Sequence, residues 1–100
     1  MTYLAPSKAN IRNIRDIHAA LQDYASSSSR IELDLENCED IDLSFLQLVE
    51  SVRKSAAAGG KPVTLSRPAN DAVKAALKRA GFLDVLSQED AQFWLHEGMQ

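Results

Sequence analysis

Residues 30–60 read RIELDLENCEDIDLSFLQLVESVRKSAAAGG and decide the fold of the chain. Ile31, Leu33 and Leu35 alternate with acidic residues, which is the period of a half-buried strand. After an acidic turn, apolar residues recur at helical spacing and predict an amphipathic helix that Gly59–Gly60 ends. This predicted apolar face comprises Phe45, Leu48, Val49, Val52 and Ala56. The strand therefore passes into the helix directly through the acidic turn.

Short strands are expected on both sides of this unit. Tyr3–Ala5 is expected to form an edge strand that ends at Pro6, because proline donates no ladder hydrogen bond. Val63–Leu65 has the composition of a second flanking strand, and Val85–Leu86 is a candidate for a last one. Strands that are joined through helices run parallel. The sequence predicts one α/β domain over residues 1–100, with a mixed, mostly parallel sheet and helices packed chiefly on one face.

Three further helices are expected around the sheet. N-caps are expected at Asn10 for the first helix, Asn70 for the third and Ser87 for the last, and Gly81 is expected to end the third. Their apolar stripes comprise Ile11, Ile14, Ile17, Leu21 and Tyr24, then Val73, Ala76, Leu77 and Ala80, then Ala91, Trp94 and Leu95. The predicted core consists of Ile31, Leu33, Leu35, Phe45 or Leu46, Val49, Val52, Val63, Leu65, Val73 and Leu77.

Composition narrows the class of function. The net charge of −3 argues against a nucleic-acid partner, because binding phosphates requires a basic face. The single cysteine, Cys38, cannot form an internal disulfide, so nothing indicates an oxidising compartment. The chain has neither an apolar run of transmembrane length nor an apolar signal core at its N-terminus. A cytoplasmic protein without membrane insertion is therefore expected.

The sequence gives little support to catalysis. It contains no Gly-rich phosphate loop, no HExxH motif and no paired cysteine motif. Ser44 lies near Asp42, but nothing in the sequence places either histidine beside Ser44 as a base. Asp40 and Asp42 are a possible catalytic carboxylate pair, although two acids on a turn are usually only solvated. We expect no enzymatic activity, no cofactor and no metal.

Ser44 has a structural and a functional interpretation. Structurally, Ser44 and Gln47 match the S-x-x-Q capping box, and such a cap stabilises a helix by about 1 kcal/mol. Functionally, Ser44 is a candidate phosphoacceptor, because a helix N-terminus favours a bound or covalent phosphate. Asp40 and Asp42 would oppose that phosphate by repulsion of like charges.

The order of several short motifs resembles a STAS domain, the fold of anti-sigma factor antagonists. The resemblance rests on Asp42-Leu43-Ser44 after the strand, Gly59-Gly60-Lys61, Pro68-Ala69-Asn70, Ala80-Gly81-Phe82 and Val85-Leu86, and it covers about residues 10–87. In this family an Asp-Ser-Ser-Gly signature carries a serine that a GHKL-type kinase phosphorylates. Asp42 matches the aspartate and Ser44 the second serine, while Leu43 and Phe45 replace the first serine and the glycine.

The resemblance implies two alternative functions. In the first, the protein binds a switch kinase or an anti-sigma factor, and phosphorylation of Ser44 releases it. In the second, it is a constitutive adaptor in a chemotaxis or lipid-transport complex, and Ser44 only caps the helix. The candidate interface comprises Asp40, Asp42, Leu43, Ser44, Phe45 and Gln47. The bulky Phe45 would either obstruct a kinase or anchor a different partner.

Overall fold

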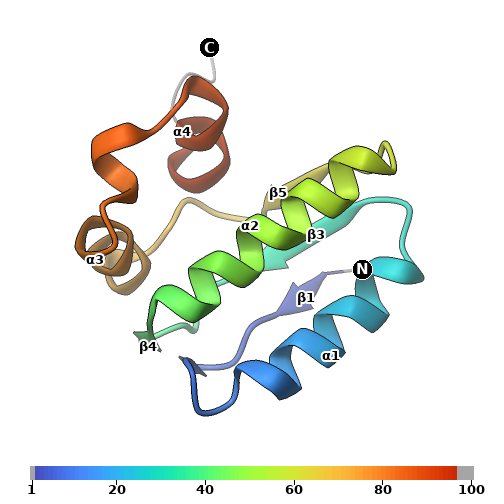
Figure 1. Cartoon of the computed structure of the whole chain (residues 1–100), viewed down its shortest axis with the longest axis horizontal. Helices are drawn as coiled ribbons and strands as arrows, with labels where there is room; N and C mark the ends of the chain where they lie inside the picture. The colour runs from blue at the N-terminus through green and yellow to red at the C-terminus, as the bar shows by residue number, and fades with distance from the viewer. Residues whose placement is uncertain (1, 97–100) are drawn as a thin grey trace.

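The structure is a computed structural model, and it describes residues 2–96 (Figure 1). Strands precede each of the first three α-helices along the chain, and helix α2 runs across the strands of a small sheet. In chain order the elements are β1 (Tyr3–Leu4), β2 (Lys8–Ala9), α1 (Ile14–Ser26), β3 (Ile31–Asp34), β4 (Asp40–Ile41), α2 (Leu43–Ala58), β5 (Val63–Leu65), α3 (Asp71–Arg79), the 3-10 helix η1 (Phe82–Val85) and α4 (Gln88–Leu95).

The main sheet has the strand order β1-β3-β5. Both pairings are parallel, and Leu33 in the central strand lies opposite Tyr3 on one side and Leu65 on the other. Ile31 and Leu33 are buried, while the acidic residues that alternate with them are half-buried. Because both pairings are parallel and helices connect the strands, the predicted α/β fold with a mostly parallel sheet is confirmed. The strand with the clearest alternating pattern, β3, lies at the centre of the sheet.

A second parallel pair, formed by β2 and β4, was not predicted. Lys8 lies opposite Asp40, and the backbone N–H groups of Glu39 and Asp40 both donate to the Ser7 carbonyl, at 2.8 and 3.0 Å. Part of the predicted acidic turn is therefore a strand. Each of these strands is only two residues long, so neither can show a period-two pattern, and their pairing depends on how the chain packs.

The core agrees closely with the prediction. Every predicted position is buried except Val52 and Val63, which are half-buried and pack against the core. Phe45 and Leu46, given as alternatives, are both buried. The last helix is also confirmed, with Trp94 fully buried and Phe93 as a further core residue. The core therefore extends from the first strand to the last helix.

Three helix ends follow the predicted capping chemistry. The Asn70 side chain accepts from the Val73 N–H at 2.8 Å, and the Ser87 hydroxyl accepts from the Asp90 N–H at 3.1 Å. Gly81 follows the third helix with a φ of 80°, a left-handed conformation that glycine adopts without steric cost. Each capping residue lies within a few residues of the helix end that it caps, which is why the sequence alone predicts these ends.

Two other local predictions were wrong. The first helix begins at Ile14 with Asn13 at the cap position, so Asn10 is not its cap and Ile11 lies in the preceding loop, 68% exposed. Val85–Leu86 does not form a strand, because Phe82–Val85 turn into the 3-10 helix η1 directly after Gly81. Val85 is consequently 79% exposed rather than paired within a sheet.

Candidate functional site

Asp42 caps α2 and organises the start of this helix. Its Oδ1 accepts a hydrogen bond from the Ser44 N–H at 3.1 Å, as an N-cap side chain does. The predicted capping box of Ser44 and Gln47 is therefore wrong, because the helix begins one residue before Ser44. Asp42 immediately follows β4, and its extended backbone places the carboxylate over the exposed N–H groups of the first turn.

The Ser44 hydroxyl lies in the first turn of α2, beside the Asp42 carboxylate. Ser44 Oγ donates to Asp42 Oδ1 at 2.5 Å, and the Ser44 side chain is only partly buried. Because the backbone N–H of Ser44 uses the same carboxylate oxygen, the hydroxyl is oriented without serving as the cap. Ser44 is thus a positioned hydroxyl at a helix N-terminus, where an added negative charge is favoured by the dipole.

The loop before α1 lies against this helix start. The Ile11 N–H donates to Asp42 Oδ2 at 2.9 Å, and Asn10 Nδ2 donates to Asp40 Oδ2 at 3.2 Å. Asp42 therefore connects two segments of the chain. Its Oδ1 binds the start of α2, and its Oδ2 binds the loop before α1. Asn10 and Ile11 were not predicted to belong to the site. The pairing of β2 with β4 brings them there, and strands of two residues show no alternating pattern in the sequence.

The solvent-exposed part of the site is apolar as well as acidic. Leu43 is 47% exposed and the nearby Ile11 is 68% exposed, whereas Phe45 is buried to 1% and belongs to the core. The interface role expected of Phe45 stays a prediction, and its burial places the exposed apolar area of the site on Leu43 and Ile11 instead. We call the following residues the Ser44 surface: Ile11, Asp40, Asp42, Leu43, Ser44 and Gln47.

The ionisation of the site follows from its hydrogen bonds. Desolvation alone would raise the pKa of Asp42, but the hydroxyl of Ser44 and the backbone N–H groups of Ile11, Phe45 and Ser44 donate to it. Their combined effect holds the pKa of Asp42 below its ordinary value, so the carboxylate is negative at neutral pH. The Ser44 surface therefore presents a stable negative charge.

Cys38 lies just before β4 and does not add a nucleophile. Burial, followed by the negative charge of Asp34, raises the pKa of the Cys38 thiol to about 11. The side chain is 1% exposed, and its sulfur lies 3.5 Å from the Pro6 carbonyl oxygen. A thiol is the weakly reactive form, because the thiolate is the nucleophile. Cys38 therefore acts here as a small core residue.

Residues 2–96 contain neither a metal-binding cluster nor a membrane-spanning helix. In this part of the chain, His, Cys, Asp and Glu side chains do not gather in groups of three or more that could hold a metal ion. No helix among these residues has both the length and the apolar character required to cross a membrane.

We expect Asp42, rather than Ser44, to contribute the capping energy. Replacing Asp42 by Ala should lower the free energy of unfolding by about 1 kcal/mol or more at pH 7, while Ser44→Ala should have a smaller effect. Urea denaturation of both variants measures the difference. Asp42→Asn is the control, because Asn caps helices about as well as Asp. A larger loss for Ser44→Ala than for Asp42→Ala would contradict this assignment.

The free energies of unfolding of wild type and of the Asp42 variants should depend differently on pH. A carboxyl whose folded-state pKa is lowered stabilises the protein above its unfolded pKa of about 3.9, and this stabilisation disappears as the pH falls through the folded value. The difference in the free energy of unfolding between wild type and Asp42→Ala should therefore narrow when denaturation is repeated below about pH 4. A gap that widens with acid would show that Asp42 is not held in its charged form.

The chain matches a known protein family. A family model described as "Mlab, STAS domain" matches residues 7–87, which include β2, the whole Ser44 surface and the helices up to α3. No curated protein matches the chain. The matched segment ends directly before α4, so the helix that carries Trp94 lies beyond it.

Proposed function

The chain belongs to the STAS domain family, and from this premise we propose that it is a bacterial regulatory module controlled by phosphorylation. STAS domains generally act as protein-binding modules related to anti-sigma factor antagonists, rather than as enzymes. The proposed partner is a GHKL-type serine kinase or an anti-sigma factor in the cytoplasm. The unmodified protein binds this partner through the Ser44 surface, and phosphorylation of Ser44 releases it. Residues 1–100 act as one domain in this proposal.

The observation that carries this proposal is the hydrogen bond from the Ser44 hydroxyl to Asp42. It orients Ser44 Oγ at the start of α2, on a partly exposed side chain. Asp42 and Ser44 are also the two residues that match the phosphorylation signature of the family. A serine that served only as a helix cap would accept a hydrogen bond from the backbone, and here Asp42 does so instead.

Phosphorylation would change this surface in a specific way. A phosphoserine has lost the hydroxyl proton that Ser44 donates to Asp42, and it adds about two negative charges. Repulsion would then displace the Asp42 carboxylate, whose other oxygen holds the Ile11 N–H at 2.9 Å. The helix N-terminus can still accommodate the phosphate. The modification would thus change the shape and charge of the surface that a partner recognises, while α2 stays folded.

A second candidate function is a constitutive adaptor in a chemotaxis or lipid-transport complex. The exposed Leu43 favours it, since this residue replaces a polar serine of the family signature. Together with the exposed Ile11 it gives the site an apolar component, and desolvated apolar side chains supply binding energy that needs no switch. In this case Ser44 remains unmodified and only supports the first turn of α2.

Substitution of Ser44 separates the two functions. If phosphorylation controls release, Ser44→Asp should fold but weaken binding by about tenfold, because a third carboxylate joins Asp40 and Asp42. Ser44→Ala should bind like wild type and gain no phosphate from the kinase. Calorimetry with a GHKL-type serine kinase as the partner, and intact mass after incubation with that kinase and ATP, give the two readouts.

Ser29→Asp is the matched control. Ser29 is exposed in the loop between α1 and β3, so this variant adds the same charge away from the site. It should bind the partner like wild type. If wild type gains no phosphate and Ser44→Asp binds like Ser29→Asp, the switch is refuted and the adaptor remains. Leu43→Ser should then be the variant that weakens binding.

A further inference from the structure

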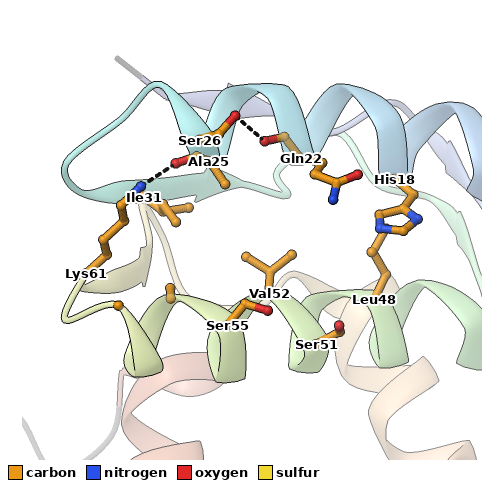
Figure 2. Close-up of a pocket in the computed structure, with 12 residues that line it drawn as sticks. His18, Gln22, Ala25, Ser26, Ile31, Leu48, Ser51, Val52, Ser55 and Lys61 are labelled. Atoms are coloured by element: carbon orange, nitrogen blue, oxygen red, sulfur yellow. Dashed lines mark hydrogen bonds between the residues drawn. The ribbon is translucent and has the colours of Figure 1, made fainter.

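A second site lies between helices α1 and α2, beyond the Ser44 surface (Figure 2). It is a hollow of about 350 Å³ that begins beside Leu48 and extends to the C-terminal end of α2. Its apolar lining comes from Ile31 of β3 and from Leu48, Val52 and Ala56 of α2. Val52 points into the space between the two helices. Ile31, Leu48 and Ala56 are buried at the base of the hollow, and the half-buried Val52 is the apolar side chain that faces its open space.

Small side chains explain why the hollow persists. Where α1 and α2 face each other, the lining includes Ala25, Ser51, Ser55 and Gly59, none of which is large enough to bridge the gap. Protein interiors are normally close-packed, and apolar atoms beside empty space lose attractive contacts. Val52 consequently remains half-buried although it lies on the apolar face of α2. An apolar group in the hollow would supply the missing contacts.

The charge of the hollow differs from that of the whole protein. The chain carries a net charge of −3, yet the described lining residues include a lysine and a histidine and no acidic residue. Lys61 closes one end, and its Nζ donates to the Ala25 carbonyl at 2.8 Å. A lysine ammonium has three N–H donors, so two remain for another acceptor. The site therefore combines an apolar wall with a cation at one end.

We propose that this hollow binds a small amphiphilic carboxylate, such as a medium-chain fatty acid. The carboxylate lies at Lys61, and the apolar chain follows Val52 toward Leu48. The hollow is close to the smallest pockets that hold organic ligands, which span about 300–1,000 Å³. This site is independent of Ser44 and of the proposed function.

Titration with octanoate tests the proposal. In ¹⁵N–¹H NMR spectra of the full chain, octanoate should cause saturable one-to-one shifts centred on Leu48, Val52, Ala56 and Lys61. Octan-1-ol has the same chain without the charge and should bind about tenfold more weakly. Lys61→Gln should lose about the same factor, because one charge-assisted hydrogen bond disappears. Lys74→Gln removes an exposed lysine on α3 and should bind octanoate like wild type.

Ser55→Phe provides a second test that leaves Lys61 in place. Ser55 is exposed at the mouth of the hollow, so a phenyl ring there should block the hollow and abolish binding while the fold persists. This variant decides the outcome if Lys61→Gln fails to fold. Shifts centred outside the hollow would overturn the proposal. So would equal binding of octanoate and octan-1-ol, or undiminished binding of octanoate to Ser55→Phe.

Discussion

Replacing Trp94 by Ala is expected to lower the free energy of unfolding by about 3–5 kcal/mol. Trp94 is the largest fully buried side chain of the described residues, and its ring meets that of Phe93 edge-on, with centroids 5.0 Å apart. Its Nε1–H donates to Glu50 Oε1 at 3.3 Å, so the substitution removes a buried ring and a hydrogen bond together. Urea denaturation followed by circular dichroism measures the loss.

This expectation depends on how firmly α4 is attached. Arg53 of α2 donates to Asp90 of α4 at 2.9 Å, lies 4.3 Å from the centre of the Phe93 ring and also pairs with Glu50. In addition, the Ala69 N–H donates to the Trp94 carbonyl at 2.8 Å. The last helix lies beyond the segment that matches the family model, yet these contacts make it part of the core.

Trp94→Phe is the control for this experiment. It keeps an aromatic ring in the site and loses the hydrogen bond to Glu50, so we expect a smaller loss of about 1–2 kcal/mol. If Trp94→Ala cost less than about 1 kcal/mol, α4 would be a loosely attached appendage rather than a part of the domain. Such a result would contradict the packing seen here.

Replacing Leu33 by Ala should have the second largest effect, a loss of about 2–5 kcal/mol. Leu33 is 1% exposed in the central strand β3, between β1 and β5. Since it is enclosed by paired strands on both sides, the surrounding chain has little freedom to collapse into the cavity that Ala leaves. Small domains have a total stability of about 5–15 kcal/mol, so this single change would remove a large part of it.

Leu4→Ala makes the same chemical change at an exposed position. Leu4 belongs to the edge strand β1 and is 56% exposed, so its truncation should cost less than about 1 kcal/mol. Thermal or urea denaturation of both variants gives the comparison. Equal losses at the two positions would show that β3 does not lie at the centre of the sheet, and would contradict the strand order.

Features of this protein that depend on neighbouring residues could be predicted from the amino-acid sequence. The alternation of Ile31 and Leu33 with acidic residues identified β3, and the helical spacing after it identified α2. Caps at Asn70 and Ser87 were recognised because a cap and its helix lie within three residues of each other. The order of these motifs also led to the STAS family. The strand pattern and the helix caps involve residues that are close in the sequence, and the family resemblance depends on the order of such short motifs.

The way in which distant segments complete the site depends on tertiary packing and could not be predicted. The pairing of β2 with β4 brings Ile11 to Asp42 across 31 positions of sequence, and strands of two residues carry no periodic signal. Phe45 and Leu43 lie two residues apart in the first turn of α2, and the direction in which α2 packs buries one and exposes the other. The hollow at Lys61 likewise forms between α1 and α2, whose lining residues lie far apart in the sequence. Its shape depends on the distance between α1 and α2, which tertiary packing sets.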